Sequence, residues 1–412
     1  MSFQTGLSGL NASSQNLDVI GNNIANANTA GMKSSRTEFS ALVANALGAA
    51  GSSGAGIGVQ AATISQQFSQ GNINITGNGL DAAINGGGFF QVSLPDKTLA
   101  YTRDGSFKLD KDGNIMTNSG ANVLGNKIDS LGKPIVGDTP SPLSLPTAGP
   151  IAAKSTSAIN AEFNLDARAV DAASTTPPTP LTTYGTSVTA YDGQGLPVTV
   201  SLYLEKASQN TWNVYTNDLS GTVPPGAPVL LGSPITFDPT TGKQDAASPW
   251  LTAQPIGMSS VNGPIIPTPT LDLSKVTQFG NNFAVSNLKQ DGYTSGDFVK
   301  MTIGTDGIIT ASYSNGQSQS AGQIALAEFR NEQGLSPTGG NSWIATSASG
   351  APVQGVPGQG KFGALRAGAL EDSNVDLTGE LVNMMVAQRA YQANAQTIKT
   401  QDQILSTLVN LR

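Results

Sequence analysis

Apolar residues follow a helical spacing at both ends of the chain. From residue 3 to residue 27 they recur in alternating steps of four and three, the heptad spacing of helices that pack against partner helices. The same spacing runs from about Leu377 to the end, behind Ser373 or Asp376 as the capping residue. Gly31 stands where the first helix should end, because glycine adopts the left-handed conformation that closes helices. The pattern predicts two terminal helices with an apolar seam made of Phe3, Leu7, Leu10, Leu17, Ile20, Ile24, Leu381, Met384, Tyr391, Ile398, Leu405 and Val409.

The two seams need partners, because a helix with an exposed apolar stripe gains most of its stability from packing. We expect the terminal helices to pair with each other and then with neighbouring molecules. The alternative is that each stripe is the core face of a single chain. Assembly is favoured because the stripes lie at opposite ends of the chain, and because Asp18 and Lys33 are the only charged residues among the first 33.

The middle of the chain has the pattern of β structure. Short alternating runs are separated by Asp-Gly or Asn-Gly pairs, which favour hairpin turns. These pairs begin at Asp104, Asp112, Asp192, Asp291, Asp306 and Asn315. Stretches rich in Gly, Pro, Ser and Thr interrupt the β segments and mark loops.

We therefore predict an α+β multidomain fold, with a terminal α-helical coiled-coil domain and two mainly β domains nested in the chain. Residues 1–33 with 372–412 form the helical assembly domain, and residues 34–70 are a linker or extended segment. Residues 71–147 with 288–366 form an inner β domain. Residues 148–287 form an outer β domain inserted into it.

Composition narrows the function classes. The 412 residues include no histidine and no cysteine, which removes the commonest general base, the common transition-metal ligands and any disulfide. Only 12% of the residues are charged, against about 25% in a typical soluble domain. The net charge of −7 argues against nucleic-acid binding. We expect no enzymatic activity, no cofactor, no metal, no cleaved signal peptide and no membrane insertion.

Two short motifs could carry chemistry, and each has a simpler explanation. Asp110 to Asn114 resembles the start of a calcium loop but lacks its later glycine and glutamate, so we expect a hairpin turn. Ser130 and Lys133 match S-x-x-K without the supporting motifs of that enzyme class. Glu371 and Asp372 precede the last helix, where acidic residues are expected because they stabilise a helix N-terminus.

Three segments resemble the flagellar rod and hook subunit family. They are residues 21–33 (GNNIANANTAGMK), residues 79–90 (GLDAAINGGGFF), and residues 371–377 (EDSNVDL) with 388–396 (QRAYQANAQ). The resemblance assigns the family motif to Asn22, Asn23, Asn26, Asn28, Gly31, Asn374, Gln388, Arg389, Tyr391 and Asn394. Residues 190–195 and 210–215, within the insert, look like the outer domain of a hook subunit. The length of the insert favours the hook over the shorter distal-rod subunit.

The resemblance implies a homopolymer that forms a curved, flexible tube, joins rod to filament and transmits torque. It implies partners in the distal rod, the hook cap and the hook–filament junction, and passage through the type III export apparatus to the cell exterior. A non-flagellar adhesin or another tube-forming β protein is the rival class, and such a protein would not need heptad helices at both ends.

Overall fold

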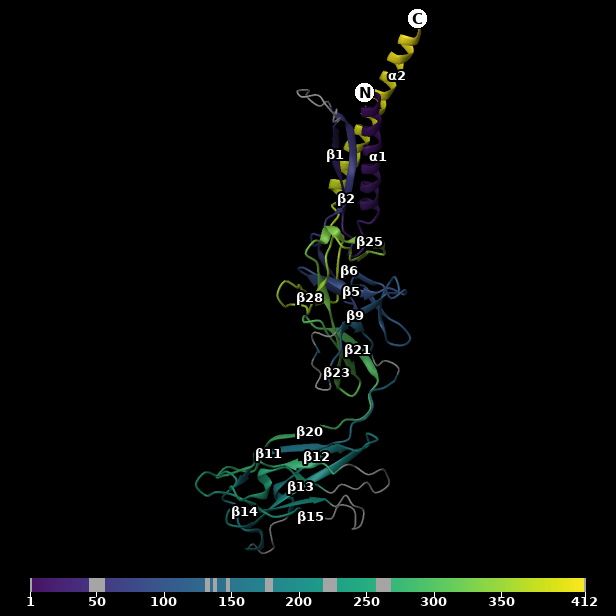
Figure 1. Ribbon diagram of the computed structural model, residues 1–412. Coiled ribbons are helices and arrows are strands. Elements are labelled where there is room, and N and C mark those ends of the chain that lie inside the picture. Colours follow the sequence, from purple (N-terminus) through teal and green to yellow (C-terminus); the bar gives the residue numbers. More distant parts are fainter. Residues whose placement is uncertain are drawn as a thin grey trace. The chain divides into compact units, whose positions relative to one another are not determined.

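A computed structural model describes residues 2–43, 56–129, 134–135, 139–145, 149–174, 181–217, 228–256 and 268–410. Two long helices stand at the ends of the chain, α1 (Ser2–Ala25) and α2 (Leu377–Asn410). Between them the described residues form strands and the short 3-10 helices η1 (Ala172–Ser174), η2 (Leu181–Tyr184), η3 (Pro249–Leu251) and η4 (Glu332–Gly334). The predicted α+β class with terminal helices is confirmed (Figure 1).

The chain divides into two compact units. Unit 1 comprises Met1–Ala148, Val299–Ser312 and Ser318–Arg412, and unit 2 comprises Gly149–Phe298 and Tyr313–Gln317. Unit 2 is thus contributed almost entirely by one insert in the chain that builds unit 1. The predicted boundary after residue 287 falls inside the strand that runs from Ala284 to Gln290. The exact domain limits remain a proposal.

Unit 1 contains one large sheet and three two-stranded sheets. The two-stranded sheets are β1 (Ser35–Val43) with β2 (Gly56–Gln66), β3 (Ile73–Ile75) with β29 (Ala369–Glu371), and β4 (Ala82–Asn85) with β28 (Ala364–Ala367). In each of the last two, a strand from early in the chain pairs with one from near its end. The large sheet comprises β5 (Phe89–Ser93), β6 (Leu99–Thr102), β7 (Phe107–Leu109), β8 (Ile115–Thr117), β9 (Asn122–Asn126), β10 (Ser141–Pro142), β21 (Phe298–Ile303), β22 (Ile308–Tyr313), β23 (Ser318–Ile324), β24 (Leu326–Glu328), β25 (Ser336–Gly339), β26 (Ser342–Ile344) and β27 (Val353–Gly355).

An aromatic cluster forms part of the core of unit 1. Phe89, Tyr101, Phe329 and Trp343 are buried there, with Phe68 packed against them. Their rings meet edge to face, with centroids 4.7 to 6.1 Å apart, the geometry that the ring quadrupoles favour. Phe68 belongs to the segment that follows β2, so the cluster draws that segment onto the sheet.

Unit 2 is built from two five-stranded sheets that share one apolar core. The first holds β11 (Ala158–Asp166), β17 (Gln254–Pro255), β18 (Thr270–Asp272), β19 (Thr277–Phe279) and β20 (Ala284–Gln290). The second holds β12 (Gly185–Tyr191), β13 (Pro197–Ser208), β14 (Thr211–Asn217), β15 (Pro228–Leu230) and β16 (Ile235–Thr236). Alternate side chains of β11, β13 and β14 point inward, as the period of a strand requires, and they pack with Trp212 and Trp250.

Four of the six predicted turn pairs join strands that pair with each other. The pairs at Asp112, Asp192, Asp306 and Asn315 connect β7 to β8, β12 to β13, β21 to β22 and β22 to β23. The pairs at Asp104 and Asp291 do not make hairpins. Asp291 accepts hydrogen bonds from the backbone N–H groups of Ser157 and Ala158, at 2.7 and 2.9 Å, and so fastens the end of β20 to the start of β11.

The insert should be removable without unfolding its host. Ile151 and Gly296 exchange two backbone hydrogen bonds of 2.8 and 3.3 Å, so the strands that enter and leave unit 2 run side by side. A host whose two ends are adjacent tolerates loss of the inserted part. We expect a variant with residues 152–295 replaced by a short Gly-Ser linker to keep helical circular dichroism and a cooperative melt. Loss of the cooperative melt would show that the host needs the insert to fold.

Candidate functional site

The two terminal helices pack against each other in antiparallel fashion. Gly6 faces Ile398 and Gly9 faces Asn394, so closely that a Cβ atom on either glycine would lie 3.1 Å from Ile398 Cγ1 or 2.9 Å from the Asn394 amide. The Asn394 amide also donates to Ser13 Oγ at 3.5 Å. The predicted pairing of the helices is therefore confirmed. The contact is formed by small residues of α1, Gly6, Gly9 and Ser13, which let the helices approach closely. The sequence analysis did not assign these residues to the seam.

Five of the eleven seam residues whose side chains the structure describes are exposed, and six are buried or partly buried. Phe3 and Leu7 of α1 are 46% and 43% exposed. On α2 the exposed seam residues are Leu381, Tyr391 and Leu405. Ile20 is buried, and the partly buried seam residues are Leu10, Leu17, Ile24, Met384 and Ile398. The Val409 side chain lies outside the described residues. A single chain therefore leaves much of the seam uncovered. Its role as an assembly surface stays a prediction.

The β1–β2 hairpin lies along the helix pair and bounds a groove with it. The segment predicted to be a linker or extended carries these two strands, and Val59 donates its backbone N–H to Ser8 Oγ at 3.3 Å. The groove has a volume of about 870 Å³. Its apolar lining comes from Ala12, Val19, Ile20, Phe39, Val59, Val386, Ala387 and Ala390, and its polar lining includes Asn16, Arg36, Glu380, Asn383 and Asn394.

A buried ion cluster lies where the helices meet the sheets of unit 1. Glu371, at the end of β29, accepts from Lys33 Nζ at 2.6 Å and from Arg103 Nη1 at 3.2 Å. The side chains of Lys33 and Glu371 are fully buried and that of Arg103 nearly so. Lys33 follows α1, Arg103 follows β6 and Glu371 precedes α2. One carboxylate thus joins three parts of unit 1 that are far apart in the sequence.

Backbone groups complete the hydrogen bonding of the cluster. Lys33 Nζ donates to the carbonyl of Ser69 at 2.7 Å, and Glu371 Oε1 accepts from the N–H of Gly71 at 2.9 Å. Arg103 donates to the carbonyl of Gly86 at 3.0 Å, and its guanidinium lies 5.2 Å from the centre of the Phe89 ring. Within the described residues, Arg103 Nε has no hydrogen-bond partner.

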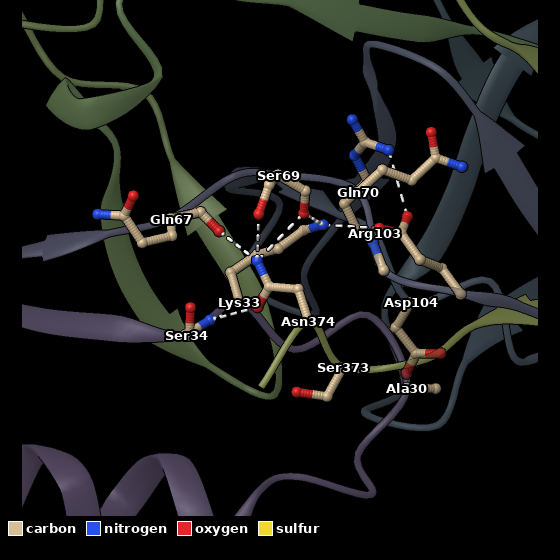
Figure 2. Close-up of polar contacts among 12 residues, drawn as sticks. Ala30, Lys33, Ser34, Gln67, Ser69, Gln70, Arg103, Asp104, Ser373 and Asn374 are labelled. Atoms are coloured by element: carbon tan, nitrogen blue, oxygen red, sulfur yellow. Dashed lines mark hydrogen bonds and ion pairs between the residues drawn. The ribbon is translucent and has the colours of Figure 1, made fainter. Parts of the chain in front are cut away.

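Asn374 and Asn23 tie the neighbouring segments to each other. Asn374 accepts from the N–H of Ser34 at 2.7 Å and donates to the carbonyl of Gln67 at 2.7 Å. Figure 2 shows Asn374 between Ser34 and Ser69, with Lys33 beside it. Asn23, buried near the end of α1, donates to the carbonyl of Ser35 and accepts from its N–H, at 2.8 and 2.9 Å. We call this cluster, with Lys33, Arg103 and Glu371, the junction.

Two glycines allow the chain to cross the junction. Gly31 has a φ of +69°, and its N–H donates to the carbonyl of Glu371 at 2.8 Å. A Cβ atom there would lie 2.4 Å from the backbone nitrogen of Asp104. A Cβ atom at Gly71 would lie 2.0 Å from the carbonyl oxygen of Asp372. Any side chain at these positions would push the crossing segments apart.

Burial dominates the electrostatics of the junction. It lowers the pKa of Lys33, an effect that the adjacent Glu371 carboxylate opposes. It also raises the pKa of Glu332, while the positive charges of Arg103 and Lys33 oppose that change. The free energy needed to remove the charges from water is about as large as the free energy gained from their attraction. Such a cluster therefore favours one arrangement of the segments more than it adds net stability.

The structure distributes the family-motif residues over four places: the junction, the end of α1, the contact between α1 and α2, and the exposed surface. Asn23, Gly31 and Asn374 meet at the junction. Asn22 and Asn26 bond to each other at the end of α1, at 2.6 Å, and Asn394 faces α1. Asn28, Gln388, Arg389 and Tyr391 are exposed.

The sequence analysis explained Glu371 wrongly and missed Arg103. Glu371 does not serve the N-terminus of α2, because it is buried in β29 and bonded to two cations. Arg103 stands directly before the predicted turn pair Asp104-Gly105, and nothing in the local sequence indicated that its side chain is buried. The opposite charges of Lys33 and Glu371, each beside a terminal helix, were the available signal.

The other candidate motifs have simple structural roles or lie elsewhere. Asp110 accepts from the N–H groups of Asp112 and Asn114, at 2.8 and 2.9 Å, in the turn between β7 and β8, so the predicted hairpin is confirmed. Ser130 and Lys133 lie outside the described residues. Within the described residues, no cluster of three or more acidic side chains could hold a metal, and neither long helix is apolar enough to span a membrane.

Four family models match the chain in succession. They are described as Flagella basal body rod protein (residues 3–33), Flagellar hook protein FlgE/F/G D1 domain (83–162), Flagellar basal body protein FlaE D2 domain (164–293) and Flagellar basal body rod FlgEFG protein C-terminal (366–411). The first and last of these cover the two helices together with Lys33, Glu371 and Asn374 of the junction, and the second covers Arg103. The second and third cover strands of the two units.

Full-length relatives agree with these matches. The chain is 40% identical over 426 residues to the flagellar hook protein FlgE of Salmonella typhimurium strain LT2, and 40% identical over 421 residues to that of Escherichia coli strain K12, with all of each chain covered. A crystal structure of Helicobacter pylori flagellar hook protein FlgE2 matches with a TM-score of 0.55 and 17% identity, over 72% of this chain and all of that one. That last similarity concerns the fold alone.

Paired terminal helices, a junction that joins both chain ends and an inserted β unit define a protein of the flagellar rod and hook class. Within that class, the chain belongs to the flagellar hook protein FlgE family.

Breaking the ion cluster should destabilise the protein strongly. Glu371→Gln would leave Lys33 and Arg103 buried without their carboxylate, at a cost of about 3–5 kcal/mol. The matched control is Glu38→Gln, which removes an exposed, solvent-screened ion pair with Arg36 and should change the stability little. Urea unfolding followed by helical circular dichroism measures both. Equal effects of the two substitutions would contradict a special role of the junction.

Proposed function

We propose that this chain is the structural subunit of the bacterial flagellar hook, and that it polymerises outside the cell through its terminal helices. The observation that carries the proposal is the exposed apolar surface of those helices, above all Phe3 and Leu7 on α1 and Leu381 on α2. Burying one such side chain is worth about 1.5–3 kcal/mol. A polymer repeats that gain in every subunit, whereas a monomer cannot obtain it.

The junction suits a subunit that carries mechanical load. It connects the helix pair to the sheets of unit 1 through both chain ends, by side chains that bond to the backbone of the opposite segment. A force applied to the helices therefore reaches the sheets along two segments of the chain, one after α1 and one before α2. The hydrogen bonds and ion pairs of the junction also join these two segments to each other. This supports the expected transmission of torque between rod and filament through a flexible tube.

The proposal includes the partners that a hook requires. They are other copies of the chain, the distal rod, the hook cap, the hook–filament junction proteins and the type III export apparatus. We propose no catalytic activity, no cofactor and no nucleic-acid partner. Similarity over the full length of named hook proteins supports the hook over the distal-rod subunit. The same similarity argues against an adhesin, and electron microscopy of the purified polymer tests for the expected tube.

A charge placed in the exposed seam should block assembly and spare folding. Leu7→Asp alters a side chain that a single chain leaves 43% exposed, so the thermal melt should be nearly unchanged. In a polymer, the same carboxylate would be buried without a partner, and pelletable polymer should be lost. Gln4→Asp is the matched control, because it adds the same charge at an exposed site of α1 outside the seam. Normal polymer from Leu7→Asp would remove the seam from the assembly interface.

A further inference from the structure

Helix α2 extends beyond the start of α1. Gly6 lies opposite Ile398 and Gly9 opposite Asn394, so Ser2 lies opposite about residue 402. Residues 403–410 of α2 therefore have no α1 residue beside them, and we call them the overhang. At 1.5 Å per residue they extend about 12 Å past α1. Figure 1 shows the C-terminal end of α2 lying beyond the N-terminus.

The overhang carries uncovered apolar side chains. Ile404 and Leu405 are 48% and 50% exposed. Asp402, immediately before the overhang, is the only charged residue from position 400 to position 410. The helix end therefore presents an apolar side with a single acidic residue at its edge.

The groove beside the helix pair has an apolar lining that could accept the apolar side of the overhang. Its lining combines apolar side chains of α1, the β1–β2 hairpin and α2, among them Ile20, Phe39 and Val386. Arg36, whose side chain is 67% exposed, lies at the groove and carries the charge opposite to that of Asp402. The groove is thus apolar inside, while at its edge Arg36 is paired with Glu38 at 2.9 Å and Glu380 adds a negative charge, so its match to the overhang is apolar rather than ionic.

A chain cannot fill its own groove with its own overhang. The residues of α2 that line the groove run from Glu380 to Asn394, centred near Ala387. Ile404 and Leu405 are about 17 residues further along the same straight helix, a distance of about 26 Å. An overhang that fills the groove must therefore come from another molecule.

We propose that the overhang of one copy of this chain docks in the groove of the next copy. This inference rests on the proposed function and specifies which surfaces meet. Two different surfaces are used, so each added copy again presents a vacant groove at one end and a bare overhang at the other. Such a heterologous contact produces an open-ended assembly rather than a closed dimer.

Cysteine cross-linking tests the contact directly, because the natural chain has no cysteine. Two full-length variants, Leu405→Cys and Ala390→Cys, are mixed under polymerising conditions and oxidised. Residues in contact through their side chains bring the Cβ atoms within about 3.5–4.5 Å, as a disulfide needs. We expect a cross-linked pair of chains on a non-reducing gel. Val386→Cys replaces Ala390→Cys as a second groove position.

The matched control is Gln403→Cys, an exposed overhang residue about 200° around the helix from Leu405. It should give little cross-linked product with either groove variant. Equal cross-linking from positions 403 and 405 would overturn the proposal, as would no cross-linking from Leu405→Cys with either groove position in a sample that has polymerised.

Blocking variants separate this inference from the proposed function. Leu405→Asp disables the overhang and Ala390→Trp fills the groove, so each should lose pelletable polymer while keeping the thermal melt of the natural chain. A mixture of the two retains one intact groove and one intact overhang and should sediment as a two-chain complex. If Leu7→Asp abolishes the polymer while these variants polymerise normally, the proposed function stands and this inference falls. If all three polymerise normally, the proposed function falls as well.

Discussion

A single buried carboxylate determines how this chain is organised. Glu371 accepts from both Lys33 and Arg103 with almost no solvent access, so its position fixes the segment after α1, the end of β6 and the segment before α2 at the same time. Because an unpaired charge is very costly in such surroundings, an arrangement that separated Glu371 from both cations would be strongly disfavoured. Asn23 and Asn374 add hydrogen bonds to the backbone of the same segments. The direction in which the helix pair leaves the sheets of unit 1 follows from these contacts.

Close packing by small residues explains why an apolar surface remains on the outside. Gly6 and Gly9 bring α1 against Ile398 and Asn394 of α2, and of these four residues only Ile398 belongs to the seam. A heptad pattern read from a single sequence does not say which partner covers it. Here Ile20 is buried and Leu17 and Ile24 are partly buried within the chain, whereas Phe3 and Leu7 near the start of α1 stay exposed. Folding of one chain and association between chains can therefore use separate residues on the same helix.

The sequence predicted the parts of the fold that depend on local pattern. The two helices, the β character of the middle and hairpins such as the one at Asp112 follow from periodicity and turn chemistry. The junction could not be predicted in this way, because its ion cluster joins residues up to 338 positions apart. The pairing of distant strands decides which charged side chains come into contact. Glu371 was assigned to a helix end on local grounds, yet tertiary contacts bury it. Gly31 was predicted to end the first helix, but α1 ends at Ala25, and Gly31 instead lets the following segment turn against Asp104, a packing contact that no local pattern reveals.

The separation of Lys33 and Glu371 in the sequence has a consequence for biosynthesis. The N-terminal segment can complete the junction only after nearly the whole chain, including the strand before the last helix, has become available. A truncated chain would retain α1 and its apolar surface, but it would lack the carboxylate and the asparagine that hold this helix in place. A chain without its C-terminal part therefore cannot form the junction, and its first helix cannot take the arrangement that the intact protein adopts.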